Sequence, residues 1–189
     1  INLSRGEITL CGSEEGQFGK VGFNLSCIEK VRANFNLATA LLHSFEYTEA
    51  EKVFVKVIDE DPECVMAYWG IAMSNFHPLW DQPTKEELEK GSQIISLARS
   101  LKAKSRKESD YLEAAGTMYD DWNALDHQTR ILKFEKAAEK IYLGYPEDRE
   151  AVNERINEIF QRKTESAKLE FRKVRKDGSI IWVNESTRL

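Results

Sequence analysis

The sequence lacks any apolar run near the roughly 20 residues that a membrane-spanning helix requires. It also lacks an excess of basic residues: 27 lysines and arginines stand against 32 aspartates and glutamates, for a formal net charge of −5. This balance does not favour wholesale binding of nucleic acid. Hydrophobic residues make up 41% and charged residues 31% of the chain, as is typical of a folded domain. We therefore expect a soluble protein of the cytoplasm or the periplasm, with neither a membrane nor nucleic acid as its partner.

Motifs that carry chemistry are also missing. The chain has no HExxH or CxxC, no GxSxG, and no glycine-rich phosphate loop. Its histidines are His43, His77 and His127, and a metal site needs three or four converging ligands, so we expect surface or capping histidines. Cys64 stands at a predicted helix start, but no signature of a cysteine–histidine nucleophile accompanies it. We therefore expect no enzyme activity, no cofactor and no metal.

Cysteine is scarce, and its spacing leaves two interpretations open. The three cysteines are Cys11, Cys27 and Cys64, so at least one of them is unpaired. Cys27 and Cys64 form a disulfide if the protein resides in an oxidising compartment. The alternative is a buried free thiol, because free cysteine is among the most buried residue types.

What the sequence does contain is helix periodicity, from residue 27 to residue 164. Apolar residues recur three and four apart up to Phe45, and again over 49–60. Four Ser/Thr-x-x-Glu patterns predict helix starts as capping boxes, in which the hydroxyl accepts a backbone N–H and the glutamate reaches back. These patterns are Thr48/Glu51, Ser26/Glu29, Thr84/Glu87 and Ser105/Glu108.

The stretch "DPECVMAYWG", residues 61–70, predicts the start of another helix. Asp61 is a suitable cap, and Pro62 suits the first turn, where a missing N–H costs nothing. Trp69 falls on the face expected to pack inward. Gly70 is small at a point where a neighbouring helix must come close. We interpret the stretch as the first helix of a helix pair that packs against the preceding pair.

These positions resemble the tetratricopeptide repeat (TPR), which has large and small apolar residues at fixed spacings over about 34 residues. The motif spacings are occupied by Asn34, Leu37, Ala38, Leu41, Ala50, Phe54 and Pro62. About residues 19–150 also resemble a bacterial family of tetratricopeptide proteins with similar "ALLHSFEYTEA", "DPECVMAYWG" and "YPEDREA" segments. The resemblance implies an α-solenoid of helix pairs that binds a protein or peptide without catalysis.

Stacked repeats leave a concave groove lined by the first helix of each pair. From the repeat geometry, the residues predicted to line this groove are Arg32, Phe35, Thr39, Leu42, His43, Ala67, Ile71 and Asn75. The second pair is interrupted by the insertion "HPLWDQPT". Within it, Trp80 is predicted to be an exposed loop contact, since an indole supplies a large contact area at little entropy cost.

The period changes after Pro146. A helix is expected first, and then residues alternate with a period of two on both sides of Asp177-Gly178, which predicts a β-hairpin. "PEDREAV" followed by "LEFRKVRKDGSIIWVNESTRL" resembles the C-terminal half of a PAS sensory domain. The resemblance covers 146–189, and the earlier strands that build most of the ligand pocket are absent. The junction text suits both families, so we interpret the chain as a fusion of the two, natural or artificial. The alternative is a divergent C-terminal cap whose likeness to PAS is accidental.

The predicted fold is therefore mainly α: a TPR-like solenoid of helix pairs followed by a helix and a β-hairpin. Its parts are an N-terminal extension (1–25), a helical repeat domain (26–145) and a partial PAS-like segment (146–189). The function we expect is that of a non-catalytic scaffold for a protein or peptide. The alternative is a signalling fragment, in which the PAS-like hairpin mediates association with another chain, including a second copy of itself.

Overall fold

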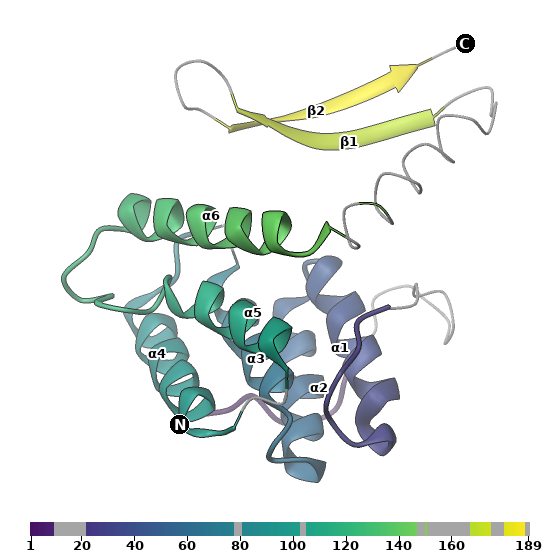
Figure 1. Ribbon diagram of the computed structural model, residues 1–189, viewed down its shortest axis with the longest axis vertical. Helices are drawn as coiled ribbons and strands as arrows, with labels where there is room; N and C mark the ends of the chain where they lie inside the picture. Colours follow the sequence, from purple (N-terminus) through teal and green to yellow (C-terminus); the bar gives the residue numbers. More distant parts are fainter. Residues whose placement is uncertain are drawn as a thin grey trace. The chain divides into compact units, whose positions relative to one another are not determined.

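The computed structural model describes side chains and backbone over 1–9, 22–77, 81–102, 105–146 and 150, and backbone alone over 167–174 and 180–187. The chain divides into two compact units, Ile1–Ile141 and Tyr142–Leu189 (Figure 1). We describe each unit by itself.

The first unit is helical over most of its described length. Its elements are a short 3₁₀ turn (Glu29–Val31) and the helices α1 (Arg32–His43), α2 (Tyr47–Glu60), α3 (Val65–Phe76), α4 (Lys85–Ser100), α5 (Arg106–Gly116) and α6 (His127–Gly144), of which the last three residues belong to the second unit. Helices α1 and α2 pack as one pair, and α3 and α4 pack as the next. Helix α3 also contacts α1, α2 and α5, so it is the central helix of the unit. The prediction of a mainly α fold is confirmed.

The helix starts separate true capping boxes from chance ones. Thr84 and Ser105 each accept the backbone N–H of a glutamate three residues on, and Glu87 and Glu108 reach back to close the boxes of α4 and α5. The boxes predicted at Thr48 and Ser26 are wrong. Helix α2 begins after Glu46 with no side-chain cap, and no side-chain cap precedes the 3₁₀ turn.

A close approach of α2 to α3 sets the distance between the first two pairs. Phe54 of α2 is fully buried and its ring lies edge-on to that of Phe35, with centroids 5.6 Å apart. A Cβ atom on Gly70 of α3 would lie 2.3 Å from Cζ of Phe54, nearer than side-chain atoms approach one another. The prediction that Gly70 admits a neighbouring helix is confirmed. Leu37 and Trp69 are partly buried and pack against the same core.

The start of α3 differs from the prediction. The helix begins at Val65 with Cys64 as its N-cap, three residues later than the Asp61–Pro62 start expected from the sequence. Asp61 instead accepts the N–H of Ile28 at 2.9 Å and that of Glu63 at 3.3 Å. Its carboxylate was recruited by a distant part of the chain, which a local capping rule cannot anticipate.

In the second unit, β1 (Ala167–Val174) and β2 (Ile180–Thr187) pair in an antiparallel two-stranded sheet. The register sets Phe171 opposite Val183. These strands lie where the sequence predicts a hairpin, while Asp177-Gly178 and most of the helix expected after Pro146 fall outside the described residues. Across the part of the chain that the structure describes, no helix is long and apolar enough to cross a membrane.

Candidate functional site

The residues predicted to line a groove are mostly buried in the helical unit. Six of the eight, namely Phe35, Thr39, Leu42, Ala67, Ile71 and Asn75, are no more than 7% exposed. Ala67, Ile71 and Asn75 are buried because α3 is enclosed by α1, α2, α4 and α5, whereas the other three lie on α1, which packs against α2 and α3. Phe35 lies against Phe54 of the paired helix instead of facing outward. These six side chains are therefore buried in the described helical unit, and their contact with a partner stays a prediction.

The other predicted contact residues have different surroundings. Arg32 is half-buried and pairs with Glu29 at 2.9 Å, and His43 is exposed in the last turn of α1. Both are accessible to a partner. Trp80, the predicted loop contact, lies outside the described residues.

A polar cleft of about 320 Å³ opens where α2, α3 and α4 meet the N-terminal segment. It is lined by Asn2, Ser4, Tyr47, Thr48, Glu51, Ser74, Asn75, His77, Glu86, Glu87 and Lys90. Three glutamates against one lysine give the lining an acidic balance. Such a cleft favours ligands that donate hydrogen bonds or carry positive charge.

Glu51 is the centre of this cleft. It is 4% exposed, and its carboxylate bonds to three charged or polar groups. Lys90 of α4 forms an ion pair with it, and Asn75 of α3 donates to its Oε2 at 3.0 Å. The backbone N–H of Ser4 donates to its Oε1 at 2.7 Å. A buried carboxylate with these partners is satisfied, and one of its bonds is to main chain that any amino acid could supply.

His77 and Glu87 form the rim of the cleft. Nε2 of His77 lies 2.8 Å from Oε1 of Glu87, and its Nδ1 lies 3.3 Å from the Asp81 carbonyl oxygen. Partial burial of Glu87 acts to raise its pKa, but hydrogen bonds from the Thr84 N–H and from His77 outweigh it and hold the pKa below its usual value. His77 thus acts as a link between α3 and the capping box of α4.

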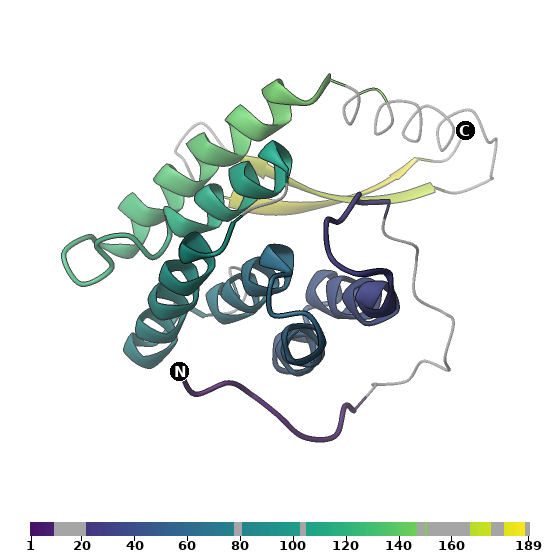
Figure 2. The same ribbon diagram turned by 60° about the horizontal axis from the view of Figure 1, so that its bottom comes forward.

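The N-terminal segment has no helix or strand and crosses the outer side of α2, which is seen nearly end-on in Figure 2. Beyond the Ser4 contact, the Thr9 N–H donates to Oε2 of Glu49 at 2.9 Å. Lys52 donates to the carbonyl oxygen of Glu7 at 3.0 Å. The segment is therefore bound through its backbone at several points along one helix.

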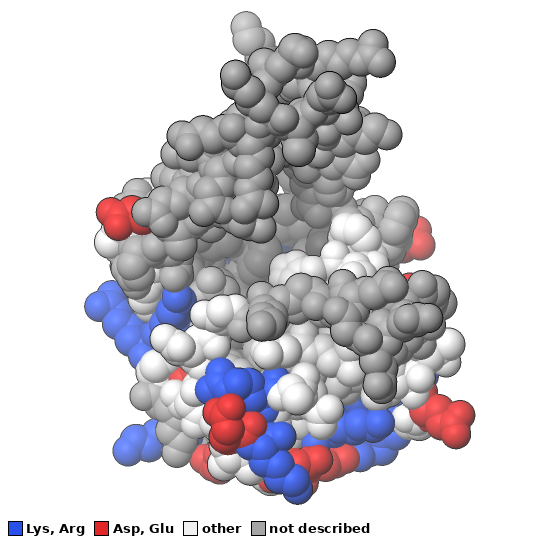
Figure 3. Space-filling view, turned by 90° about the vertical axis from the view of Figure 1, so that its right-hand side faces the viewer, with Lys and Arg blue, Asp and Glu red and all other residues white. Residues whose placement is uncertain are grey.

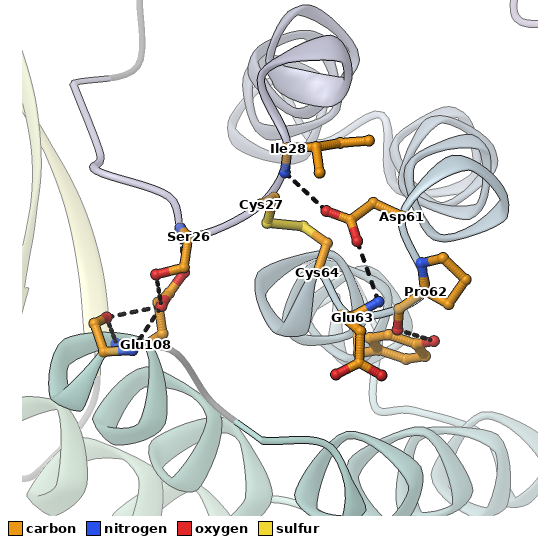
Figure 4. Close-up of a disulfide and its surroundings, with 10 residues drawn as sticks. Ser26, Cys27, Ile28, Asp61, Pro62, Glu63, Cys64 and Glu108 are labelled. Atoms are coloured by element: carbon orange, nitrogen blue, oxygen red, sulfur yellow. Dashed lines mark hydrogen bonds between the residues drawn. A yellow bond between two sulfur atoms is a disulfide. The ribbon is translucent and has the colours of Figure 1, made fainter.

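A second non-helical segment, residues 22–28, is fixed by a disulfide between Cys27 and Cys64 (Figure 4). The structure therefore has the paired form of the two alternatives that the sequence left open. On the same segment, Ser26 donates from its N–H and its hydroxyl to Glu108, at 2.9 Å and 2.8 Å. Glu108 is 1% exposed, so it joins this segment to the start of α5 from within the core.

The two cysteines of this disulfide and the neighbouring Asp61 lie as close together as metal ligands, but all three are already engaged. Among the described residues, Cys27, Asp61 and Cys64 place one ligand atom each within 4.8 Å of one another. The two sulfur atoms are bonded to each other, so neither is available as a thiolate ligand. Asp61 also already accepts two backbone N–H groups. The arrangement is suited to holding chain segments together.

On the face shown in Figure 3, lysines and arginines lie beside aspartates and glutamates over the described residues. Charges of opposite sign are also paired on α4, where Arg99 bonds to both Glu113 and Asp120 at 2.7 Å. These two carboxylates raise the pKa of the Arg99 guanidinium above its ordinary value. Over the described residues of this face, the two signs of charge are therefore interspersed.

Asn75, which was predicted to line a groove, lines the cleft, but sequence reasoning assigned none of its other lining residues to a site, although Glu51 carried a signal. It falls on a row with Val55 and Ile58 at helical spacing, so an acidic residue occupies an otherwise apolar row. The contacts of Ser4, Glu7 and Thr9 carried no signal, because they use backbone atoms.

Comparison with known proteins addresses only the end of the chain. Residues 141–189 match the PAS fold. This match begins near the boundary between the two units and includes both strands. It does not extend over the helices from α1 to α5. No curated protein and no solved structure matches the chain.

Proposed function

We propose that the helical unit is a non-catalytic scaffold that binds a protein or peptide, built as a short TPR-like solenoid. The observation that carries this proposal is the position of α3, which packs on its own partner α4, on both helices of the preceding pair and on α5. Contact with the next pair on each side is how repeat proteins bury apolar surface that a single pair leaves exposed.

The ionisable groups of the helical unit support a binding role. In the described cleft, Glu51, Lys90, His77 and Glu87 bond to one another or to backbone, which fixes helices and a chain segment. Arrangements of this type recognise main-chain donors and positive charge. A scaffold of this kind has binding as its activity and needs no cofactor.

A second candidate function rests on the PAS match at residues 141–189. A two-stranded sheet is marginal in water, so β1 and β2 gain stability from a further strand or from a covering surface. A second chain could supply it by adding a strand to an open edge. Under this alternative the hairpin mediates association and the helical unit transmits the contact.

Affinity purification with the whole chain as bait tests both candidates. Gly70→Val places methyl groups where Phe54 lies and disrupts the stacking of the pairs. Val183→Pro removes a backbone donor in the middle of β2 and disrupts the hairpin. Under the scaffold proposal, Gly70→Val loses the captured partner and Val183→Pro retains it.

The reverse pattern, with loss of self-association in Val183→Pro by sedimentation velocity, would favour the association function. Capture that neither variant changes would contradict both. A turnover reaction that His43→Ala or Cys64→Ala abolishes would overturn the non-catalytic assignment.

A further inference from the structure

The N-terminal segment is held on α2 by the kind of contact that binds a peptide ligand. Its three backbone contacts are to Glu51, Lys52 and Glu49, all on α2. Backbone groups are the same in every peptide, so these bonds select an extended conformation and not a sequence. This is how main-chain recognition of extended peptides supplies affinity in general.

Side chains of the segment add selectivity to this surface. Leu3 and Ile8 are partly buried and pack against the core of the helical unit. Arg5 forms a two-point ion pair with Asp59, in which Nη2 lies 2.9 Å from Oδ1. A planar guanidinium matched to a carboxylate in this way is specific in geometry, and lysine would not reproduce it.

Gly6 adds a conformational requirement. Its φ of +124° lies in a region that residues with a side chain rarely adopt. The residue stands between Arg5, which reaches Asp59, and Glu7, whose carbonyl oxygen meets Lys52. A chain that makes both contacts therefore needs glycine between them.

We propose that the outer side of α2 is a peptide-binding surface that residues 2–9 occupy as a ligand in cis. The partner it fits is an extended segment of another protein with an apolar residue, an arginine followed by glycine, and a second apolar residue, at the spacing of Leu3, Arg5 and Ile8. This inference rests on the proposed scaffold function and identifies the surface through which the scaffold binds its partner.

Exchange is feasible because the docked segment is not woven into the fold. The contacts described for residues 2–9 are hydrogen bonds, an ion pair and apolar packing, with no strand pairing and no covalent bond to the helices. A tethered segment competes at an effective concentration of about 1 mM, so an outside ligand binds readily only when the cis segment is weakened or the ligand is abundant.

The test uses the full chain and a fluorescent peptide with the sequence of residues 1–9, followed by anisotropy. The chain is prepared in its native form and with its own segment weakened by Leu3→Asp and Arg5→Ala. We expect the weakened chain to bind the peptide at least about tenfold more tightly than the native chain, because the tethered competitor is removed. Circular dichroism checks that the helical unit stays folded.

Matched variants tie the binding to this surface. In the weakened chain, Asp59→Arg should abolish binding of the native peptide, and a peptide with Arg5→Asp should restore it through the swapped charges. A peptide with Gly6→Ala should bind about fivefold more weakly, because alanine resists the positive φ. Lys56→Gln, on an exposed part of α2, should change nothing.

The proposal is overturned if the weakened, folded chain shows no saturable binding at millimolar peptide, or if binding does not depend on Asp59. Failure here is distinct from failure of the scaffold function. If only the peptide-binding surface is wrong, the native chain still captures a partner and Gly70→Val still loses it. The partner then binds at a surface other than the outer side of α2.

Discussion

Two non-helical segments lie against the helical unit, and they are held in opposite ways. Residues 22–28 are held by the Cys27–Cys64 bond and by the buried carboxylates of Asp61 and Glu108. Residues 1–9 are held by hydrogen bonds to α2 and by an ion pair whose side chains are 58% and 45% exposed. The first set is covalent or shielded from water, whereas water and salt compete with much of the second. The comparison indicates that residues 22–28 are held permanently, whereas residues 1–9 can exchange with a peptide from another chain.

Removal of the disulfide should have the largest effect. The bond closes a loop over a sequence separation of 37, for which chain entropy predicts a stabilisation of about 4 kcal/mol. We expect Cys64→Ala, or a reductant, to lower the free energy of unfolding of the helical unit by about this amount in urea titrations. Cys11→Ser is the control and should leave the reductant effect intact. Equal stability in oxidised and reduced protein would remove the basis for calling residues 22–28 the permanent segment.

The next largest effect is expected for Glu108→Gln. Glu108 accepts the N–H groups of both Ser26 and Ser105, and glutamine replaces one of its two acceptor oxygens with a donor. Because the site is buried, one N–H is left without a partner, at a cost of about 2 kcal/mol in the free energy of unfolding.

Glu87→Gln is the matched control, since it makes the same change in the more exposed capping box of α4, where the glutamate likewise binds a second partner, His77. Water can satisfy the freed donor there, so thermal unfolding should shift less. Equal shifts in the two variants would show that the bonds from Glu108 to residues 22–28 contribute nothing beyond an ordinary cap.

The capping boxes also show how far the sequence could predict this fold. The local pattern was right at Thr84 and Ser105, where the glutamate closes the box and also binds a more distant partner, His77 or Ser26. It was wrong at Thr48, because Glu51 is recruited by Asn75 and Lys90 from other helices. The recurrence of apolar residues three and four apart located the helices, because this pattern depends only on residues that are close in sequence. Contacts between residues far apart were not encoded in that pattern.

The candidate site was less predictable than the helices. A helix such as α3, apolar on nearly all sides, gives no indication of which face will stay open, so Ala67 and Ile71 were assigned to a groove although both are fully buried. The close packing at Gly70 was predictable, because a glycine in an apolar helix indicates a near neighbour. The bonds from α2 to the backbone of residues 4–9 could not be predicted, because backbone groups do not depend on which amino acids are present.

A small effect on stability and a clear local effect are expected for Asp59→Asn. The Arg5–Asp59 pair is exposed, and such pairs add little to global stability. We expect the unfolding midpoint to stay the same, while the amide of Ser4 exchanges with solvent faster in hydrogen-exchange measurements. Lys56→Gln is the control for a charge change elsewhere on α2. A marked loss of global stability in Asp59→Asn would place residues 1–9 with the permanent segment.

The smallest effect on the fold is expected from acid, which should act on the exchangeable segment first. The hydrogen bond from Arg5 lowers the pKa of Asp59. At Glu49, burial acts to raise the pKa, but hydrogen bonds from Lys52 and from the Thr9 N–H lower it further. A carboxyl whose pKa is lower in the docked state contributes to docking above its free pKa, and the contribution is lost as the pH falls through the docked value.

Residues 1–9 should therefore leave α2 on acidification while residues 22–28 remain in place, since a disulfide does not titrate. Amide shifts of Ser4 and Thr9, followed by NMR against pH, should move together toward their values in the free peptide before the shift of Ser26 changes. In Asp59→Asn only the Glu49 contribution remains, so the transition should become shallower. Simultaneous release of both segments would mean that acid unfolds the whole helical unit, and that the two segments do not differ in the way we infer.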